Sequence, residues 1–202
     1  MKKVAICIPH YGDLKPNFTL DLFGLLGEFP TDRQLEVSLH RVSSSILLQG
    51  RHDLARMALA EEADYALFLD ADMRFPRDSL LRLLHHNKPS IGANYTQRNP
   101  PHQPTASKDN KRLSSLGRSG IQEVDTVGFG VCLIATDVFR KVAKPWFMFG
   151  YNPRVDDYVG EDVYFFAKAK AAGFPAFVDH DLSQDVRHIG EVELDVDMSA
   201  VG

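Results

Sequence analysis

Two carboxylates stand one residue apart in the segment YALFLDADMRFP, residues 65–76, directly after a continuous apolar run. Asp70 and Asp72 offer the oxygen ligands that Mg²⁺ or Mn²⁺ binds together with phosphate oxygens and water. A turn that uses Asp to cap the following helix is the simpler explanation of such a pair taken alone. The segment is not an EF-hand, because no further acidic positions, glycine and distal Glu follow it. Other residues must therefore decide whether the pair is a metal site.

Further candidate residues lie toward the end of the chain. Glu161 and Asp162 begin a helical pattern after a glycine, where acidic side chains also complement the helix dipole. His188 lies in the segment DVRHIG, outside any clear periodic element. Taken singly, these are helix-terminal acids and a surface histidine, so only their combination with the first pair argues for a site. A second Asp-x-Asp, Asp179 and Asp181, is interpreted as incidental.

The elements that must position these residues alternate between strand and helix. Strand patterns occupy residues 4–8, 35–42, 65–69, 90–95 and 176–178, helical patterns occupy 18–29, 50–63, 76–86 and 161–172, and regular structure also covers 126–135 and a helical turn at 137–142. This order predicts an α/β domain with a largely parallel sheet. In such a sheet ligands bind beyond the carboxyl ends of the strands, which is where Asp70 and Asp72 stand.

Bulk composition is that of an ordinary globular protein. The 202 residues are 44% hydrophobic and 25% charged, with a net charge of −4, so we expect one domain and no broad electrostatic binding of nucleic acid. The apolar run at residues 4–8 is too short for a signal peptide, and no segment reaches the ~20 apolar residues of a membrane helix. A cytoplasmic protein without a membrane segment is predicted, with Cys7 and Cys132 as buried free thiols.

Four segments, LFLDADM, VGFGVCLIATDVF, GEDVYFFAKAKAAGF and HIG, follow one another in this order and spacing. Together they resemble the nucleotide-sugar glycosyltransferases of the GT-A fold, family 2 type, including short versions found in phage and bacterial genomes. The resemblance covers residues 3–190. It implies a single Rossmann-related domain with a mixed, mostly parallel sheet flanked by helices: residues 1–95 form the nucleotide donor half, 96–120 a basic flexible loop and 121–190 the acceptor and catalytic half. Residues 191–202 are expected to be an acidic tail, either an edge strand or a solvated end.

The resemblance implies a role for each matching residue. Asp72 is expected to bind Mn²⁺ or Mg²⁺ directly, Asp70 to face the ribose or reach the metal through water, and His188 to complete the metal site. Asp162 is expected to remove the acceptor's proton, with Glu161 orienting it or the acceptor. The remaining implied positions are the donor-binding residues Pro9, Tyr11 and Arg51 and the acceptor-binding residues Gly128, Phe129, Gly130 and Trp146. Core packing is the competing interpretation of the aromatic cluster around Trp146.

The implied activity is transfer of a sugar from a nucleoside-diphosphate sugar, of the UDP or GDP type, to an acceptor hydroxyl. Inversion through Asp162 is favoured, although an Asp-x-Asp with a distal His also occurs in retaining GT-A enzymes. The sequence departs from the family pattern at two places: the strand at 35–42 leads into HRVSSS without the usual Asp, and His52 replaces the Asn that normally follows Arg51. The donor base is therefore left open.

The segment 96–120 is basic within an acidic chain and shows no period. Its charges are Arg98, Lys108, Lys111, Arg112 and Arg118 against Asp109 alone. A connection of this length is usually functional or disordered, so a lid over the donor is one interpretation. The other is contact with an anionic acceptor, such as a phosphorylated glycan or a modified nucleic-acid base flipped out of its duplex.

Two alternatives belong to other classes of protein. A haloacid-dehalogenase-type phosphohydrolase also carries Asp-x-Asp after an apolar strand, but normally after the first strand rather than the third. A catalytically inactive nucleotide-sugar-binding module would keep the fold and lose the base or the metal ligands, and all of these are present.

Overall fold

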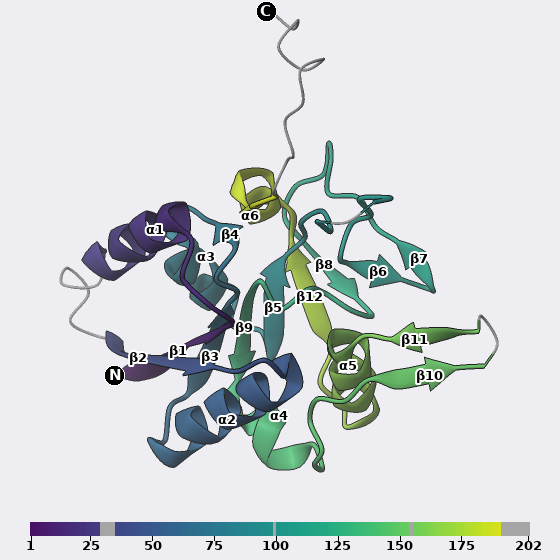
Figure 1. The fold of residues 1–202 in the computed structure, drawn as a ribbon, viewed down its shortest axis with the longest axis horizontal. Coiled ribbons are helices and arrows are strands. Elements are labelled where there is room, and N and C mark those ends of the chain that lie inside the picture. The colour runs from purple at the N-terminus through teal and green to yellow at the C-terminus, as the bar shows by residue number, and fades with distance from the viewer. Residues whose placement is uncertain (29–34, 99, 154–155, 191–202) are drawn as a thin grey trace, which may run out of the picture.

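The computed structural model describes residues 1–28, 35–98, 100–153 and 156–190. Seven strands of this part of the chain form one sheet in the order β2-β1-β3-β9-β5-β12-β8 (Figure 1). They are β1 (Lys2–His10), β2 (Leu35–Ser43), β3 (Tyr65–Leu69), β5 (Ser90–Ala93), β8 (Ile121–Val124), β9 (Val131–Ala135) and β12 (Ala176–Asp179). Only β9 and β8 run against the other five, which confirms the predicted mixed, mostly parallel sheet.

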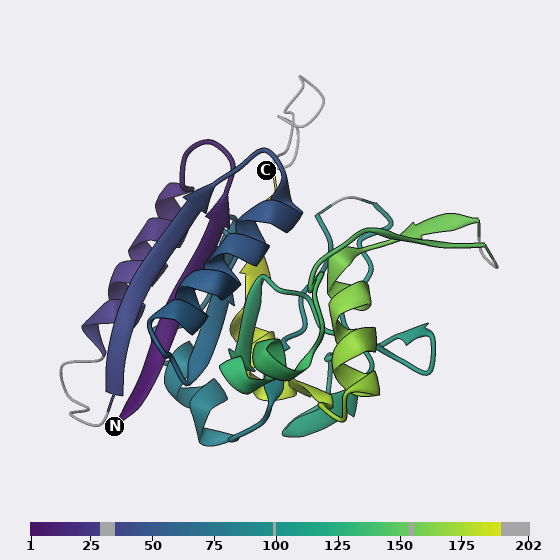
Figure 2. The ribbon, with the colours of Figure 1, turned by 90° about the horizontal axis from the view of Figure 1, so that it is seen from below.

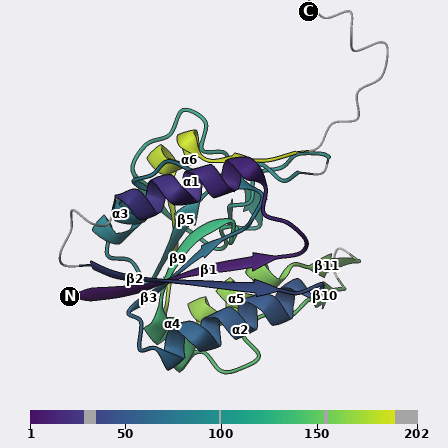
Figure 3. The same cartoon turned by 60° about the vertical axis from the view of Figure 1, so that its left-hand side comes forward.

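Helices cover both faces of this sheet (Figure 3). One face carries α1 (Pro16–Gly27), α3 (Ser79–His85) and α6 (His180–Asp185), and the other carries α2 (Leu47–Ala60), α4 (Thr136–Lys141) and α5 (Glu161–Ala171). Strand β1 shows why its sequence is continuously apolar. Val4, Ile6 and Ile8 belong to the core under α1, whereas Ala5 and Cys7 belong to the core under α2, so successive side chains are buried on opposite faces.

Within the described residues, three two-stranded ladders lie outside the main sheet. They are β4 (Met73–Arg74) with β13 (Arg187–His188), β6 (Ser107–Lys108) with β7 (Lys111–Arg112), and β10 (Gly150–Asn152) with β11 (Asp157–Val159). The β10–β11 hairpin projects from the body beside α5, as Figures 1 and 2 both show. It leads directly into the first turn of α5, which carries Glu161 and Asp162.

The prediction that residues 96–120 lack regular structure is wrong at the β6–β7 hairpin. Its turn residues Asp109 and Asn110 have φ of 51° and 60°, the left-handed conformation that a two-residue hairpin turn requires and that Asp and Asn tolerate. The backbone N–H of Asp109 also donates to Asp125 Oδ2 at 2.6 Å. A Lys-Asp-Asn-Lys sequence is therefore a turn signal that the lack of apolar periodicity concealed.

Most other predicted elements are present with shifted ends. The segment 126–135 becomes strand only from Val131, while β8, α6 and the β10–β11 hairpin were not foreseen. The second Asp-x-Asp is structural: Asp179 accepts from the N–H of Leu182 to cap α6, and Asp181 accepts from the N–H of Gly120. The tail at 191–202 lies outside the described residues. Within the described ranges, no helix is long and apolar enough to cross a membrane.

Both cysteines are buried and unpaired, as predicted. Helix α5 ends at Ala171, and Gly173 follows its cap residue with φ of 86°. The N–H of Phe174 donates to the carbonyl of Ala169 and that of Gly173 to the carbonyl of Lys170, the two bonds of a Schellman cap.

Candidate active site

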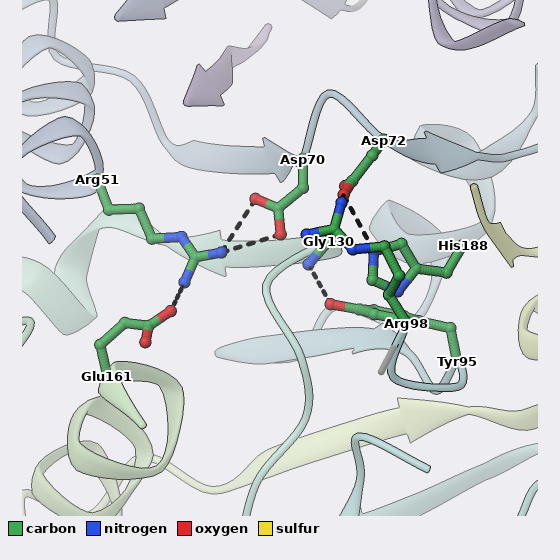
Figure 4. A network of polar contacts seen from close by, with 8 residues as sticks. All are labelled: Arg51, Asp70, Asp72, Tyr95, Arg98, Gly130, Glu161 and His188. Atoms are coloured by element: carbon green, nitrogen blue, oxygen red, sulfur yellow. Dashed lines mark hydrogen bonds and ion pairs between the residues drawn. The ribbon is translucent and has the colours of Figure 1, made fainter. Parts of the chain in front are cut away.

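The two carboxylates of the Asp-x-Asp point in different directions (Figure 4). Strand β3 ends at Leu69, and the chain then turns, with the N–H of Asp70 donating to the carbonyl of Gly130 at 3.0 Å and the N–H of Met73 donating to the carbonyl of Asp70 at 3.1 Å. Because of this turn Asp70 faces Arg51, whereas Asp72 faces His188 and Arg98. The structure thus separates the pair into two local environments.

His188 reaches Asp72 through the β4–β13 ladder. This ladder pairs His188 with Met73, and the N–H of Ile189 donates to the carbonyl of Asp72 at 2.7 Å. His188 Nε2 lies 3.1 Å from Asp72 Oδ2, and its Nδ1 lies 3.1 Å from the carbonyl oxygen of Thr96. A carbonyl only accepts, so Nδ1 carries a proton and donates it to Thr96, which fixes the orientation of the imidazole.

Charge pairing sets the protonation of these two groups. The hydrogen bond to Asp72 raises the pKa of His188, against the opposing effect of burial. Burial alone would raise the pKa of Asp72, but the hydrogen bond and charge of His188 and the charge of Arg98 lower it overall. Asp72 is therefore ionised and half-enclosed by positive groups.

The Asp72–His188 pair has the chemistry of a divalent metal site. It brings together one carboxylate oxygen and one imidazole nitrogen whose second nitrogen donates to a backbone carbonyl, the arrangement that metal-binding histidines adopt. Asp70 accepts from Arg51 instead of contacting His188. The described residues hold no group of three or more His, Cys, Asp or Glu side chains around one point. Two protein ligands suit Mg²⁺ or Mn²⁺, which take substrate phosphates and water for the rest.

Arg51 is the centre of a buried ion network. Its side chain is 3% exposed, its Nη2 donates to both carboxylate oxygens of Asp70 at 2.9 and 3.0 Å, and its Nη1 donates to Glu161. The guanidinium also lies over the ring of Phe129, 5.0 Å from its centroid. Burial lowers the pKa of Arg51, but Asp70 and Glu161 raise it by more, so the side chain stays charged. Arg51, which was predicted to contact the nucleotide, therefore already forms ion pairs with the carboxylates of Asp70 and Glu161.

Asp162 lies at the start of α5 beside this network. Its Oδ1 accepts from the N–H of Val163 at 2.7 Å, and a Cβ on Gly160 would lie 2.7 Å from the same oxygen, so the carboxylate would have to turn away from this position if residue 160 had a side chain. Burial raises the pKa of Asp162, and so does the nearby charge of Glu161. Asp162 lacks the direct Arg51 contact that neutralises Glu161.

The glycines on either side of Phe129 make room for Tyr95. A Cβ on Gly128 would lie 2.5 Å from the Tyr95 hydroxyl, and a Cβ on Gly130 would lie 2.6 Å from it. The N–H of Gly130 donates to this hydroxyl at 2.9 Å, and the Tyr95 ring contacts the His188 ring edge-on at 5.5 Å between centroids. Because Gly128 and Gly130 have no side chains, the Tyr95 hydroxyl fits beside them and the Tyr95 ring contacts the His188 ring. Tyr95 carries no motif that a single sequence could have revealed.

Two adjoining pockets meet at the Asp-x-Asp. The β1 pocket, of about 420 Å³, follows the carboxyl ends of β1 and β2, and the α5 pocket, of about 400 Å³, reaches the start of α5. The β1 pocket is lined by Pro9, His10, Tyr11, Asp13, Lys15, Ser44, Ser45, Leu47, Asp70, Ala71, Asp72 and Arg98. The α5 pocket is lined by Leu47, Arg51, Asp70, Tyr95, Gln97, Arg98, Pro100, Thr105, Phe129, Glu161, Asp162 and His188.

The predicted site residues are mostly gathered here. Pro9, Tyr11 and Asp72 line the β1 pocket, whereas Phe129, Asp162 and His188 line the α5 pocket. The sequence did not indicate Tyr95, Ser44 or Ser45 as site residues, and it gave Arg98 no role beyond membership of the basic segment. A larger hollow, of about 910 Å³, lies at the opposite, amino ends of the strands and holds none of the predicted residues.

The structure does not bring Trp146 to either pocket. Its side chain is 2% exposed, its Nε1 donates to the carbonyl of Val142 at 3.0 Å, and its ring packs on Phe139 and His52. The expected contact with an acceptor is therefore replaced by core packing, because the Trp146 ring contacts Phe139 of α4 and His52 of α2. Phe147 is also buried, whereas Phe149 is exposed.

The sequence matches no protein-family model and no curated protein. Solved structures do match, among them A197 from STIV, with a TM-score of 0.59 and 16% identity over 97% of this chain and 98% of that one. GalNAc-T7, solved with UDP, GalNAc and Mn²⁺, has a TM-score of 0.58 and 13% identity over 95% of this chain and 44% of its own. The catalytic domain of Drosophila β1,4-galactosyltransferase 7, solved with xylobiose, has a TM-score of 0.56 and 14% identity over 99% and 79%.

These similarities extend over nearly the whole chain, and at such low identity they establish the fold. The match includes the mixed sheet and the helices that flank it. The chain therefore has the GT-A fold that these glycosyltransferases share.

Proposed function

We propose that this chain is a metal-dependent glycosyltransferase that moves a sugar from a nucleoside-diphosphate sugar, of the UDP or GDP type, to an acceptor hydroxyl. The observation that carries the proposal is the Asp72–His188 pair. Asp72 lines the β1 pocket and His188 lines the α5 pocket, so the two candidate metal ligands meet where the pockets adjoin. The GT-A fold supports this reading, and the structure of GalNAc-T7 was solved with UDP and Mn²⁺.

The β1 pocket would take the nucleoside. Pro9 and the exposed ring of Tyr11 would pack on the base, while the hydroxyls of Ser44 and Ser45 stand where the family usually has an acidic residue. Asp70 lines both pockets. A carboxylate has about four acceptor positions, so Asp70 can still accept from a ribose hydroxyl while it holds Arg51.

Asp72 and His188 would hold Mn²⁺ or Mg²⁺ through Oδ2 and Nε2. Such a cation neutralises the negative charge of the departing diphosphate. Thr96 would keep the His188 ring in place, because its carbonyl accepts the Nδ1 proton, and Tyr95 would support the ring from its edge.

Asp162 would act as the general base in the α5 pocket. It would take the proton of the acceptor hydroxyl while that oxygen attacks the anomeric carbon from the face opposite the diphosphate. The new carbon–oxygen bond forms as the bond to the diphosphate breaks, and the electron pair leaves with the diphosphate, so one displacement inverts the configuration. A carboxylate with a raised pKa is a stronger base than an exposed one, which suits this role. Glu161 would be a positioning residue that acts through Arg51.

The β6–β7 hairpin supports an anionic acceptor, such as a phosphorylated glycan or a modified nucleic-acid base. Lys111 and Arg112 are exposed, and none of the described carboxylates forms an ion pair with either, whereas Lys108 pairs with Glu123. The positive charge of Arg112 also acts on Asp162, where it opposes the rise in pKa. A negatively charged acceptor would therefore be attracted toward the base.

The test of the proposed function is a thermal-shift panel of UDP, GDP, CDP and ADP, each with and without Mn²⁺. Ligands that bind only the folded state raise the melting temperature by mass action. We expect a Mn²⁺-dependent rise with UDP or GDP in the wild type and its loss in Asp72→Ala. Asp181→Ala is the matched control, because it alters the second Asp-x-Asp, and it should keep the wild-type rise.

Donor hydrolysis separates an enzyme from a binding module. Slow release of the nucleoside diphosphate from UDP- or GDP-sugars is expected in the wild type and not in Asp162→Asn. Binding without hydrolysis would indicate a nucleotide-sugar-binding module. Absence of any nucleotide-dependent shift would refute the transferase proposal.

A further inference from the structure

Arg98 lies at the junction of the two pockets. Of the side chains that the structure describes, Leu47, Asp70 and Arg98 line both the β1 pocket and the α5 pocket, and Arg98 is the cation among them. A nucleoside-diphosphate sugar that fills both pockets must pass its diphosphate through this junction, because the diphosphate joins the nucleoside to the sugar. The junction therefore places Arg98 beside the most negatively charged part of the donor.

The other cations near the junction are less suited to this contact. Arg51 lines only the α5 pocket, and its terminal nitrogens already donate to Asp70 and Glu161. Lys15 lines only the β1 pocket. Among the described acidic side chains, by contrast, Arg98 contacts one, through the 3.2 Å contact of its Nη1 with Asp72 Oδ2. Its side chain is 49% exposed, and an exposed ion pair of this kind contributes little stability, so Arg98 can reorient at small cost.

Asp72 Oδ2 contacts two side chains, His188 and Arg98, and a bound cation would compete with the contact that Arg98 makes. His188 Nε2 lies 3.1 Å from this oxygen and Arg98 Nη1 lies 3.2 Å from it. Figure 4 shows both side chains pointing toward Asp72. Asp72 Oδ2 is also the oxygen that would bind a divalent cation. Two positive groups at one carboxylate oxygen repel each other, so Arg98 and a cation held by Asp72 compete for the same place.

We propose that Arg98 is a diphosphate-binding residue that turns from Asp72 onto the diphosphate when the donor binds. The inference rests on the proposed function. The planar guanidinium presents paired N–H donors that match phosphate oxygens, and hydrogen bonds between charged partners are the strong ones. Charge that accumulates on the leaving diphosphate strengthens this contact as the sugar departs.

The first experiment measures nucleotide affinity by calorimetry in the presence of Mn²⁺. UDP and GDP are compared with UMP and GMP on the wild type and on Arg98→Ala. We expect the affinity of the variant for the diphosphate to fall about 10- to 100-fold, the loss for charge-assisted hydrogen bonds, while the affinity for the monophosphate falls much less.

The second experiment measures binding of Mn²⁺ alone, from the electron paramagnetic resonance signal of the free ion. Because Arg98 competes for Asp72 Oδ2, Arg98→Ala should bind Mn²⁺ at least as tightly as the wild type, whereas Asp72→Asn should bind it more weakly. Arg118→Ala is the control: it removes another arginine of the same segment, one that donates to Gln122 and lines neither pocket. It should leave both affinities unchanged.

Opposite effects on diphosphate and Mn²⁺ are the signature of the proposed role. Equal diphosphate affinity in Arg98→Ala and the wild type would overturn the inference and leave the proposed function standing. A variant that loses diphosphate, monophosphate and Mn²⁺ together would also overturn it, because that pattern indicates a structural role. A wild type that binds neither nucleotides nor Mn²⁺ would refute the proposed function and the inference with it.

Discussion

At the residue scale, Asp162 combines a functional advantage with a cost in stability. Burial and the neighbouring charge of Glu161 raise its pKa, with the Val163 N–H, Arg51 and Arg112 opposing them. A carboxyl group whose pKa is higher in the folded state stabilises the protein below the unfolded pKa. That contribution is lost as the pH rises through the folded pKa. The ionised form, which is the one able to take a proton, is therefore the destabilised one.

Asp162→Asn should separate these two effects. We expect donor hydrolysis to fall by about 10²- to 10⁴-fold, the usual contribution of a general base. The free energy of unfolding of the variant relative to the wild type should increase as the pH rises from 4 to 8, because asparagine does not titrate. Urea denaturation across this range measures the difference, with the exposed Asp137→Asn as control. A difference in stability that does not change with pH would contradict the raised pKa.

The sequence motifs indicated which side chains gather at the site. They did not indicate which atoms each of these side chains contacts. Asp72 and His188, 116 positions apart, lie together as the resemblance implied. Asp70 and Arg51 also lie at the site, but they bind each other. The reason is the turn after β3, which sends Asp70 and Asp72 in different directions. A residue pattern gives the spacing of two carboxylates and not the backbone conformation between them.

At the element scale, short ladders and hairpins position several of the side chains on which the proposals depend. The β4–β13 ladder brings His188 to Asp72. The β6–β7 hairpin, whose second strand is Lys111–Arg112, lies on the α5 side of the molecule (Figures 1 and 2). Elements of two or three residues carry no measurable period, so a single sequence reveals them only through turn residues. Long elements with many apolar positions, such as β1 and α2, were predicted because their pattern repeats.

The β6–β7 hairpin should bind polyanions through its unpaired charges. Because the chain as a whole is acidic, retention on immobilised heparin must come from a local basic patch. We expect the double variant Lys111→Ala, Arg112→Ala to elute at lower salt than the wild type and to retain donor hydrolysis. Lys108→Ala, whose lysine already pairs with Glu123, is the control and should elute close to the wild type. Identical elution of the double variant and the wild type would remove the basis for an anionic acceptor.

At the scale of the whole molecule, the sheet and the pockets follow from one topology. The alternation of strands and helices predicts a sheet buried on both faces, and the carboxyl ends of β1, β2 and β3 then supply the β1 pocket. The antiparallel course of β9 was not predictable, because an apolar strand has the same pattern in either direction. Its reversal matters for the site: β9 lies between β3 and β5, so the Gly128–Gly130 segment before it reaches Asp70 and Tyr95.

Arg51 joins the two halves of this topology. It comes from α2, and it binds the carboxylate after β3 and the first residue of α5, so one side chain ties the proposed donor half to the catalytic half. Asp70 and Glu161 are both largely enclosed. Removing the arginine would leave two carboxylates near each other without a compensating charge, which is costly in a buried site.

Arg51→Met should therefore destabilise the protein by about 3–5 kcal/mol, measured by urea denaturation at neutral pH. The exposed pair of Arg140 and Asp137 provides the control, and Arg140→Met should cost less than about 1 kcal/mol. Adding Asp70→Asn and Glu161→Gln to Arg51→Met should restore part of the lost stability, because the neutral amides no longer need the guanidinium. This triple variant should still not hydrolyse the donor, since the groups that fix the start of α5 against β3 are gone. A small effect of Arg51→Met, comparable to that of the surface control, would mean that the two halves are held together by packing alone.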